Sequence, residues 1–341
     1  MSTAPREHTV SVVVPVYRGA VTLDALVAEI AALAEPFRTP GGHLARVSEV
    51  VLVHDCGPDD SDVVIRRLAA AHDWVRPVWL SRNYGQHAAS MAGMASSGGD
   101  WVATIDEDGQ HDPADLGALL DRAITERADV VYAAPTNPAP HGAFRNTVSR
   151  GAKTSLRWMT GNRDASSFHS YRLVLGEVAR SVAAYAGSGV YLDVALGWVS
   201  RRVATQPVRL RAEGDRPSGY SFGTLLSHYR RMVVTGGTRL LRVVSLVGLL
   251  LAVLGFLGAI AIVWARIHGS VVVQGWASMM VVTLISSGFV LVSLGVVAEY
   301  VGAAVNMALG RPLYVIVRDR EDGPLGSAGA VRATDDEEAL R

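Results

Sequence analysis

Cysteine, net charge and the common nucleotide-binding motifs are scarce or missing in this sequence of 341 residues. Cys56 is the only cysteine, which excludes a disulfide within the chain and any metal site built from several thiolates. The 32 basic residues balance 32 acidic residues, so the formal net charge is zero. Because nucleic-acid-binding proteins usually carry a basic excess or stripe, we expect no nucleic-acid partner.

The sequence contains neither the glycine pattern of dinucleotide-binding folds nor a Walker A loop. These absences disfavour a Rossmann dehydrogenase and a P-loop ATPase. Charged residues are also missing from two long stretches near the C-terminus, 243–265 and 269–298. A membrane span needs about 20 apolar residues. We therefore predict two transmembrane helices, at about 243–265 and 275–298, although two buried core helices are the alternative.

Arginines flank these predicted spans unevenly. Four precede the first span, namely Arg230, Arg231, Arg239 and Arg242, and two follow the second, namely Arg311 and Arg318. The short connection between the spans carries only Arg266 and His268. The positive-inside rule then predicts a multi-pass protein of the cell (inner or plasma) membrane, with both long ends in the cytoplasm.

The predicted organisation has three parts. Residues 1–229 mix charged and apolar residues and form a cytoplasmic domain. Residues 230–317 comprise an amphipathic membrane-proximal segment, the two spans and a membrane-proximal return segment. Residues 318–341 are rich in Asp, Glu, Gly and Ala and are predicted to be disordered.

Strand-like and helix-like segments alternate in the first part. The strands are centred on 11–16, 47–53, 76–80, 100–105 and 128–134, and the helices lie near 22–35, 61–72, 86–97 and 113–126. The strand runs are almost wholly apolar, which is typical of strands covered on both faces. The pattern predicts an α/β domain with an open, mostly parallel sheet. In such sheets, ligands bind beyond the carboxyl ends of the strands.

Asp106 and Asp108 follow the fourth predicted strand directly. Side chains at i and i+2 of an extended segment point the same way. Two such carboxylates can hold a hard divalent cation and leave positions for a diphosphate, and Gln110 can add an oxygen or hold a water molecule. The alternative is an acidic loop that precedes a helix begun by Asp112 and Pro113.

Six segments together make the chain resemble the family 2 glycosyltransferases with a GT-A fold, over roughly residues 9–317. They are SVVVPVY, VLVHDCGPDDS, SRNYGQHAASMAG, TIDEDGQHDP, SGYSFGTLL and GVVAEYVGAAVNMALGRPLYVIV. The chain is most similar to the membrane-anchored polyprenyl-phosphate sugar transferases, which include dolichyl-phosphate mannose synthases and undecaprenyl-phosphate aminoarabinose transferases.

The resemblance implies roles for particular residues. Pro15, Tyr17 and Asp55 would contact the nucleoside of the donor. Asp106, Asp108 and Gln110 would bind Mg²⁺ or Mn²⁺ at the donor diphosphate, with the two aspartates as the catalytic pair. Arg145 and Ser149 would hold the acceptor phosphate, and Arg211 and Arg216 are candidate replacements for phosphate contacts that this sequence lacks.

The sequence also departs from the family pattern. His54 precedes Asp55 where the family has paired aspartates, and Arg18 and Gly19 stand where it has Asn and Glu. These changes leave a UDP-linked and a GDP-linked donor equally open.

The expected activity is metal-dependent, inverting transfer of a sugar from a nucleotide-sugar to an undecaprenyl- or decaprenyl-type phosphate at the cytoplasmic membrane face. The resemblance also implies a capacity to form homo-oligomers. One alternative is a processive polysaccharide synthase, which carries Gln-x-x-Arg-Trp. Here Arg157 and Trp158 are present, but position 154 is Thr. The other alternative is an inactive membrane scaffold of the same fold.

Overall fold

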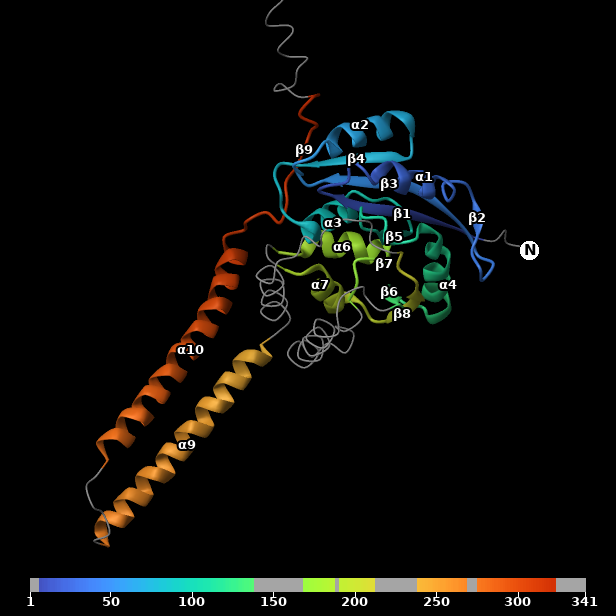
Figure 1. Ribbon diagram of the computed structural model, residues 1–341. Helices are drawn as coiled ribbons and strands as arrows, with labels where there is room; N and C mark the ends of the chain where they lie inside the picture. The colour runs from blue at the N-terminus through green and yellow to red at the C-terminus, as the bar shows by residue number, and fades with distance from the viewer. Residues whose placement is uncertain (1–5, 138–167, 188–189, 212–237, 269–274, 323–341) are drawn as a thin grey trace, which may run out of the picture.

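The computed structural model describes residues 6–137, 168–187, 190–211, 238–268 and 275–322 (Figure 1). Within these ranges, one mixed sheet of nine strands has helices on both faces, and two long helices extend away from it (Figure 1). The sheet with its covering helices corresponds to the predicted α/β domain.

The strand order along the sheet is β8-β6-β7-β5-β1-β3-β4-β9, and the short β2 pairs with β3. The strands are β1 (Glu7–Val16), β2 (Phe37–Arg38), β3 (Leu44–His54), β4 (Val75–Leu80), β5 (Trp101–Thr104), β6 (Val130–Pro135), β7 (Arg172–Leu175), β8 (Val203–Val208) and β9 (Ile316–Val317). The central strands β5, β1, β3 and β4 are parallel. β7 runs antiparallel to both β5 and β6, and β9 runs antiparallel to β4.

Two apolar clusters cover the two faces of the sheet. One contains side chains of α1 (Leu23–Ala31), α2 (Ser61–Ala71) and α4 (Leu116–Glu126). The other contains side chains of α3 (Gln86–Ala95), α6 (Gly176–Tyr185) and α7 (Leu192–Val199). Along β1, Val12 and Val14 belong to the first cluster and Val13 to the second. This alternation explains why consecutive residues of the central strands, such as 12–14 and 50–53, are apolar.

All five predicted strands and all four predicted helices are present. The predicted helix near 113–126 begins as the short 3-10 helix η1 (Pro113–Asp115) and continues as α4. The Asp112 carboxylate accepts the backbone N–H of Ala114 at 2.9 Å, so Asp112 caps this helix as its position before a proline predicts. The sequence patterns did not reveal β7, which joins the parallel part of the sheet to β6 and β8.

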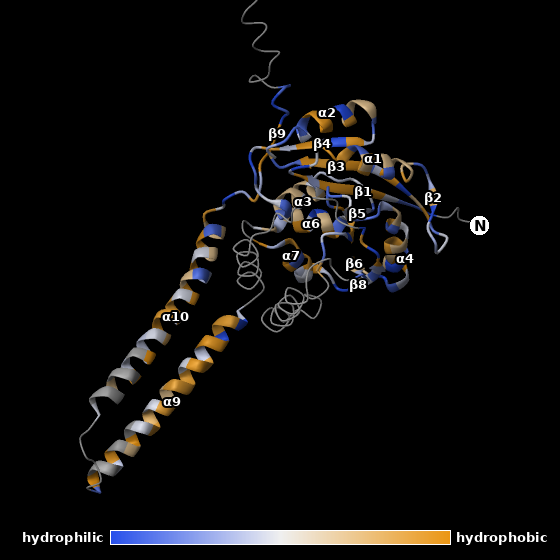
Figure 2. Ribbon diagram, in the orientation of Figure 1, coloured by the Kyte–Doolittle hydropathy of each residue, from blue (hydrophilic) through white to orange (hydrophobic). Residues whose placement is uncertain are grey.

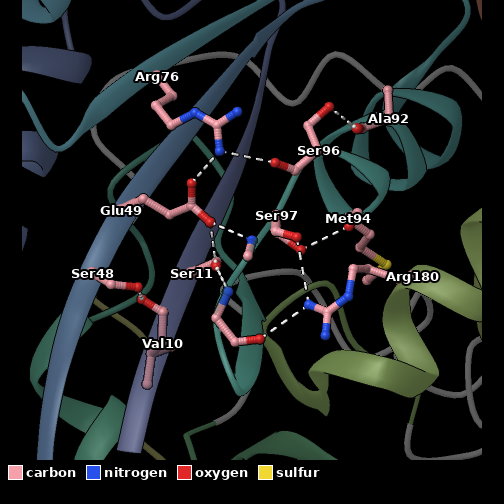
Figure 3. Close-up of polar contacts among 12 residues, drawn as sticks. Val10, Ser11, Ser48, Glu49, Arg76, Ala92, Met94, Ser96, Ser97 and Arg180 are labelled. Atoms are coloured by element: carbon pink, nitrogen blue, oxygen red, sulfur yellow. Dashed lines mark hydrogen bonds and ion pairs between the residues drawn. The ribbon is translucent and has the colours of Figure 1, made fainter.

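Glu49 lies in a buried polar network near the amino end of β5 (Figure 3). Its carboxylate accepts Ser11 Oγ at 2.7 Å, the backbone N–H of Gly98 at 2.5 Å and the Arg76 guanidinium at 2.5 Å. Burial alone would raise the pKa of Glu49, but these three donors outweigh burial and lower it. The network therefore ties β1, β3 and β4 to the segment before β5 through one ionised group.

The two long helices are α9 (Arg239–Ile267) and α10 (Trp276–Ala308). Their most apolar stretches, Arg239–Gly258 and Ile285–Ala308, have mean hydropathies of 2.5 and 1.9, and neither is buried against the rest of the protein. Figure 2 shows α9 as apolar along its length, with Phe256 67% exposed. The lack of protein cover argues against core helices, because an exposed apolar surface of this size needs lipid or another partner.

The return segment after α10 reaches the sheet. β9 pairs with the end of β4, and the backbone N–H of Ser81 donates to the carbonyl of Val315 at 3.0 Å. Asp319 accepts two hydrogen bonds from Arg66 on α2, at 2.7 and 2.8 Å. Disorder of the tail stays a prediction, but its first residues, up to Asp322, are described, and Asp319 is held by this ion pair. Residues 323–341 lie outside the described residues.

Candidate active site

The residues that follow β1, β3, β4 and β5 gather at one edge of the sheet. These four strands are parallel neighbours, so their carboxyl ends meet there. Backbone bonds continue beyond the strands, because Asp55 N–H donates to the Val16 carbonyl at 2.8 Å and Ile105 N–H donates to the Val13 carbonyl at 3.0 Å. The sheet therefore brings together Tyr17, Asp55 and Asp106, as the sequence analysis expects.

The predicted nucleoside contacts differ in exposure. Tyr17 is 39% exposed, whereas Pro15 is buried within β1 opposite Val53. Asp55 is 3% exposed, and its two carboxylate oxygens accept the backbone N–H groups of Tyr84 and Gly85 at 2.7 and 2.8 Å. Burial raises the pKa of Asp55, and these two N–H groups oppose that rise. Asp55 thus holds the loop after β4, while its contact with a nucleoside stays a prediction.

Glu107 holds the loop after β1. Its carboxylate accepts the backbone N–H of Tyr17 at 3.0 Å and that of Arg18 at 2.8 Å. Sequence reasoning missed this residue because it concentrated on the aspartates on either side. The i and i+2 spacing did not give the direction of its side chain, because that argument assumes an extended segment and residues 107 and 108 lie in a turn. The turn brings the Glu107 carboxylate to the loop after β1.

Asp106 is held from two sides. Its Oδ1 accepts Gln86 Nε2 at 2.5 Å, and its Oδ2 accepts Ser170 Oγ at 2.5 Å. Its backbone N–H donates to Nδ1 of the buried His111 at 3.2 Å, so that ring carries its proton on Nε2 when neutral. The predicted metal ligand is therefore fixed by α3, by the segment before β7 and by its own turn.

Asp108 and Gln110 belong to the same turn. Asp108 Oδ1 accepts the backbone N–H of Gln110 at 3.0 Å, and Gly109 between them has a φ of 75°. A positive φ costs glycine little, which accounts for this residue at the sharpest point of the turn.

The donor set of this turn suits a hard divalent cation, because it consists of carboxylate and amide oxygens. Among the described residues, no group of three or more His, Cys, Asp and Glu side chains is placed to hold a metal ion. Two aspartates alone leave most positions of a six-coordinate ion open. A cation bound there needs further oxygens from a bound diphosphate or from water, which fits a site that assembles with its donor.

Arg211 lies beside this turn and already has anionic partners. Its backbone N–H donates to the carbonyl of Gln110 at 2.9 Å. Its guanidinium contacts Glu29 on α1 at 2.8 Å and Asp112 at 3.0 Å. These carboxylates raise the pKa of Arg211, and the first cause is the bond to Glu29. The structure thus gives Arg211 a role in holding the turn, and its predicted phosphate contact is untested.

The other three predicted acceptor residues, Arg145, Ser149 and Arg216, lie outside the described residues. His169, in the segment before β7, is described. Its ring lies 5.3 Å from that of His111, and its Nδ1 accepts the backbone N–H of Tyr171 at 3.3 Å. Among the predicted acceptor residues, the structure therefore describes Arg211 alone.

The chain is similar in sequence to known proteins of one family. Residues 11–174 match glycosyl transferase family 2. An undecaprenyl-phosphate 4-deoxy-4-formamido-L-arabinose transferase from Pseudomonas paraeruginosa is 31% identical over 320 residues, covering 91% of this chain and 89% of the relative. The Aeromonas hydrophila protein of the same name is 29% identical over 313 residues, covering 90% of this chain and 92% of the relative.

Solved structures of more distant proteins also align with part of the chain. Glucosyl-3-phosphoglycerate synthase from Mycobacterium tuberculosis, in complex with phosphoglyceric acid, is 20% identical with a TM-score of 0.47, covering 68% of this chain and 80% of that one. S. aureus TarS 1-349, in complex with UDP-GlcNAc, is 14% identical with a TM-score of 0.45, covering 67% of this chain and 66% of that one. The family match, the full-length relatives and the mixed sheet lead to one conclusion: the chain belongs to glycosyl transferase family 2 and is a glycosyltransferase with a GT-A fold.

Proposed function

We propose that this enzyme transfers a sugar from a UDP- or GDP-linked donor to a polyprenyl phosphate at the cytoplasmic face of the cell membrane. The product is a polyprenyl-phospho-monosaccharide with inverted configuration at the anomeric carbon. Relatives aligned over nine-tenths of the chain are named as transferases acting on undecaprenyl phosphate, which supports this acceptor class.

The main requirement of this reaction is that the protein aligns the sugar donor with the acceptor phosphate. A phosphate monoester has a second pKa of about 6, so a lipid phosphate is largely ionised at neutral pH and needs little help from a general base. Holding two reactants in line is worth roughly 7–11 kcal/mol of the barrier. Glu107 holds the loop after β1, and Asp55 holds the loop after β4. These hydrogen-bonded loops at the strand ends provide a surface on which a donor can be oriented.

Departure of the nucleoside diphosphate needs charge stabilisation. Asp106, Asp108 and Gln110 would hold Mg²⁺ or Mn²⁺ at this position. When bound, such an ion acts as a Lewis acid on the leaving diphosphate. The two hydrogen bonds to Asp106 keep its carboxylate in one orientation before the donor arrives, so that less reorganisation is needed during the reaction.

The acceptor explains the membrane helices. A polyprenyl tail is apolar and stays in the bilayer, while its phosphate must reach the carboxyl edge of the sheet. The observation that carries the proposal is the joining of these two parts in one chain. An oxygen-rich turn follows β5, and an unburied apolar hairpin returns to the same sheet through β9.

The test is direct transfer in membranes. Membranes containing the full-length protein are incubated with undecaprenyl phosphate and, in turn, with radiolabelled UDP- and GDP-sugars, and lipid-linked product is extracted. We expect product with at least one donor and loss of product with EDTA. Asp108→Ala should lower the rate at least about 100-fold, while Asp24→Asn, which alters only an exposed ion pair with Arg67, should leave it unchanged.

Two results would overturn the proposal. One is the absence of lipid-linked product with every donor supplied, under conditions in which a related transferase makes it. The other is full activity in Asp108→Ala, which would remove the predicted metal site from the reaction. Failure of Asp108→Ala and wild type alike to bind a nucleoside diphosphate would favour the inactive scaffold instead.

A further inference from the structure

Asp106 receives one of its two side-chain hydrogen bonds from a residue that no sequence motif singled out. Ser170 Oγ donates to Asp106 Oδ2 at 2.5 Å, opposite the bond from Gln86 to Oδ1. Ser170 lies just before β7, more than sixty residues after Asp106 in the chain. A short hydrogen bond from a hydroxyl to a carboxylate is strong and directional. Ser170 is therefore placed to set the orientation of this carboxylate.

The backbone at Ser170 is itself held by two side chains. Its carbonyl accepts Thr104 Oγ1 at 2.5 Å and Arg172 Nε at 3.3 Å. Thr104 is the last residue of β5 and pairs with Arg172 in the antiparallel ladder between β5 and β7. Thr104 and Arg172 are each 2% exposed. The segment that carries Ser170 is therefore anchored to the strand that carries Asp106.

Arg172 is anchored from a third element. Its guanidinium forms a buried ion pair with Asp193 in the first turn of α7, and Tyr132 Oη donates to the same Asp193 oxygen at 3.0 Å. Asp193 and Tyr132 are 3% and 1% exposed. Burial is the largest single influence and by itself would lower the pKa of Arg172, but the surrounding groups, Asp193 foremost, together outweigh burial and raise that pKa. Removing either partner of this ion pair would leave the other charge buried and unpaired, so the two side chains hold each other in place.

We propose that Ser170 is a positioning residue for the metal site, and that the Arg172–Asp193 pair holds it in place. Ser170 acts through Asp106, whose Oδ2 it restrains so that the carboxylate meets the cation in one geometry. The inference rests on the proposed function, since it assigns a supporting partner to a metal ligand. Partners of this kind are worth about 10–100-fold in metal affinity.

The experiment measures metal binding directly rather than activity. Full-length protein in detergent is titrated with Mn²⁺ in the presence of UDP and, separately, GDP, and free Mn²⁺ is followed by electron paramagnetic resonance. We expect Ser170→Ala to weaken Mn²⁺ binding about 10–100-fold and Ser170→Thr, which keeps the hydroxyl, to restore it within about threefold. Ser97→Ala is the matched control, because Ser97 is buried and its hydroxyl donates within its own turn, to the Met94 carbonyl at 2.7 Å.

A double-mutant cycle separates positioning from a general loss of structure. In an Asp106→Ala background, Ser170→Ala should have no further effect on Mn²⁺ affinity, because the group through which it acts is gone. Additive losses in the cycle would overturn the proposal, and so would Ser170→Ala binding Mn²⁺ as the wild type does. Wild type that binds no Mn²⁺ with either nucleotide would overturn the proposed metal site itself, which is a different result.

Discussion

Three consecutive carboxylates, residues 106 to 108, serve different purposes. Asp106 accepts hydrogen bonds from Gln86 and Ser170, and Asp108 accepts the backbone N–H of Gln110. Glu107 instead accepts the backbone N–H groups of Tyr17 and Arg18. Residues 107 and 108 lie in a turn, and their side chains have different partners, so one short acidic run can hold a neighbouring loop and also supply the proposed metal ligands.

Glu107 gives a prediction about donor binding. Glu107→Gln replaces one acceptor oxygen with an amide donor, which cannot accept both N–H groups of the loop after β1. Charge-assisted hydrogen bonds are worth about 1.5–3 kcal/mol. We expect KM for the sugar nucleotide to rise about tenfold or more while kcat changes less, as measured by steady-state kinetics in membranes. Glu126→Gln, at an exposed ion pair on α4, should change neither constant, and an unchanged KM in Glu107→Gln would contradict the loop-holding role.

The residues of the site differ in how far sequence reasoning could place them. The positions of Asp106 and Asp108 at the end of a buried strand were predictable, because they directly follow an apolar run, and their role as a ligand pair stays a prediction. The role of Glu107 was not predictable, because it depends on a turn that brings its carboxylate to the loop after β1. Ser170 was not, because its contact with Asp106 depends on β7 inserting beside β5, and no local pattern records that pairing.

At the scale of helices and strands, the ionised carboxylate of Glu49 links the parallel strands β1, β3 and β4 to the segment before β5. Its lowered pKa means that folding favours the carboxylate form. The stabilisation is therefore fully present above the ordinary glutamate pKa and is lost as the pH falls through the lower, folded value. The contributing donors are Ser11, Gly98 and Arg76 (Figure 3).

The pH dependence can be measured with one substitution. Glu49→Gln removes the titrating group but keeps an oxygen acceptor. We expect this variant to be less stable than wild type at pH 7, by about 1–3 kcal/mol, and the difference in melting temperature to shrink toward pH 4. Thermal unfolding in detergent from pH 7 to pH 4 provides the measurement. A difference that stays constant over this range would show that the ionised form of Glu49 is not what the network stabilises.

The return strand β9 is short, and its position depends on side chains beyond it. The bidentate contact of Asp319 with Arg66 is partly exposed, with side chains 9% and 29% exposed, so we expect it to contribute about 1 kcal/mol. Asp319→Asn should speed hydrogen exchange at Ile316 and Val317 about fivefold, because β9 opens more often. Exchange followed by mass spectrometry tests this. Asp24→Asn is the control, because it alters the ion pair of the neighbouring Arg67 and leaves that of Arg66 intact. No change at these amides would show that β9 is held by its own pairing with β4.

At the scale of the whole molecule, the chain consists of a GT-A domain and an apolar hairpin that returns to it (Figure 1). The arginines that flank the hairpin predict the orientation, with residues 1–229 in the cytoplasm. Protease added to sealed inverted vesicles should therefore release fragments of this domain, and protease added to intact cells should not. If residues 1–229 are cleaved only when protease is added outside intact cells, the predicted orientation is wrong. The domain would then lie outside the cytoplasm, away from the nucleotide-sugars that it is proposed to use.

The sequence by itself determined the features that depend on local periodicity and composition. These are the apolar strands and their alternating helices, the aspartate pair after β5 and two helices long enough to span a membrane. Tertiary structure alone decided which distant segments support them. β7 inserts between β5 and β6, Ser170 reaches Asp106, and β9 joins the hairpin to β4. The reason is physical: hydrophobic periodicity records which face of an element is buried, but the partner that buries it is chosen by the packing of the whole chain.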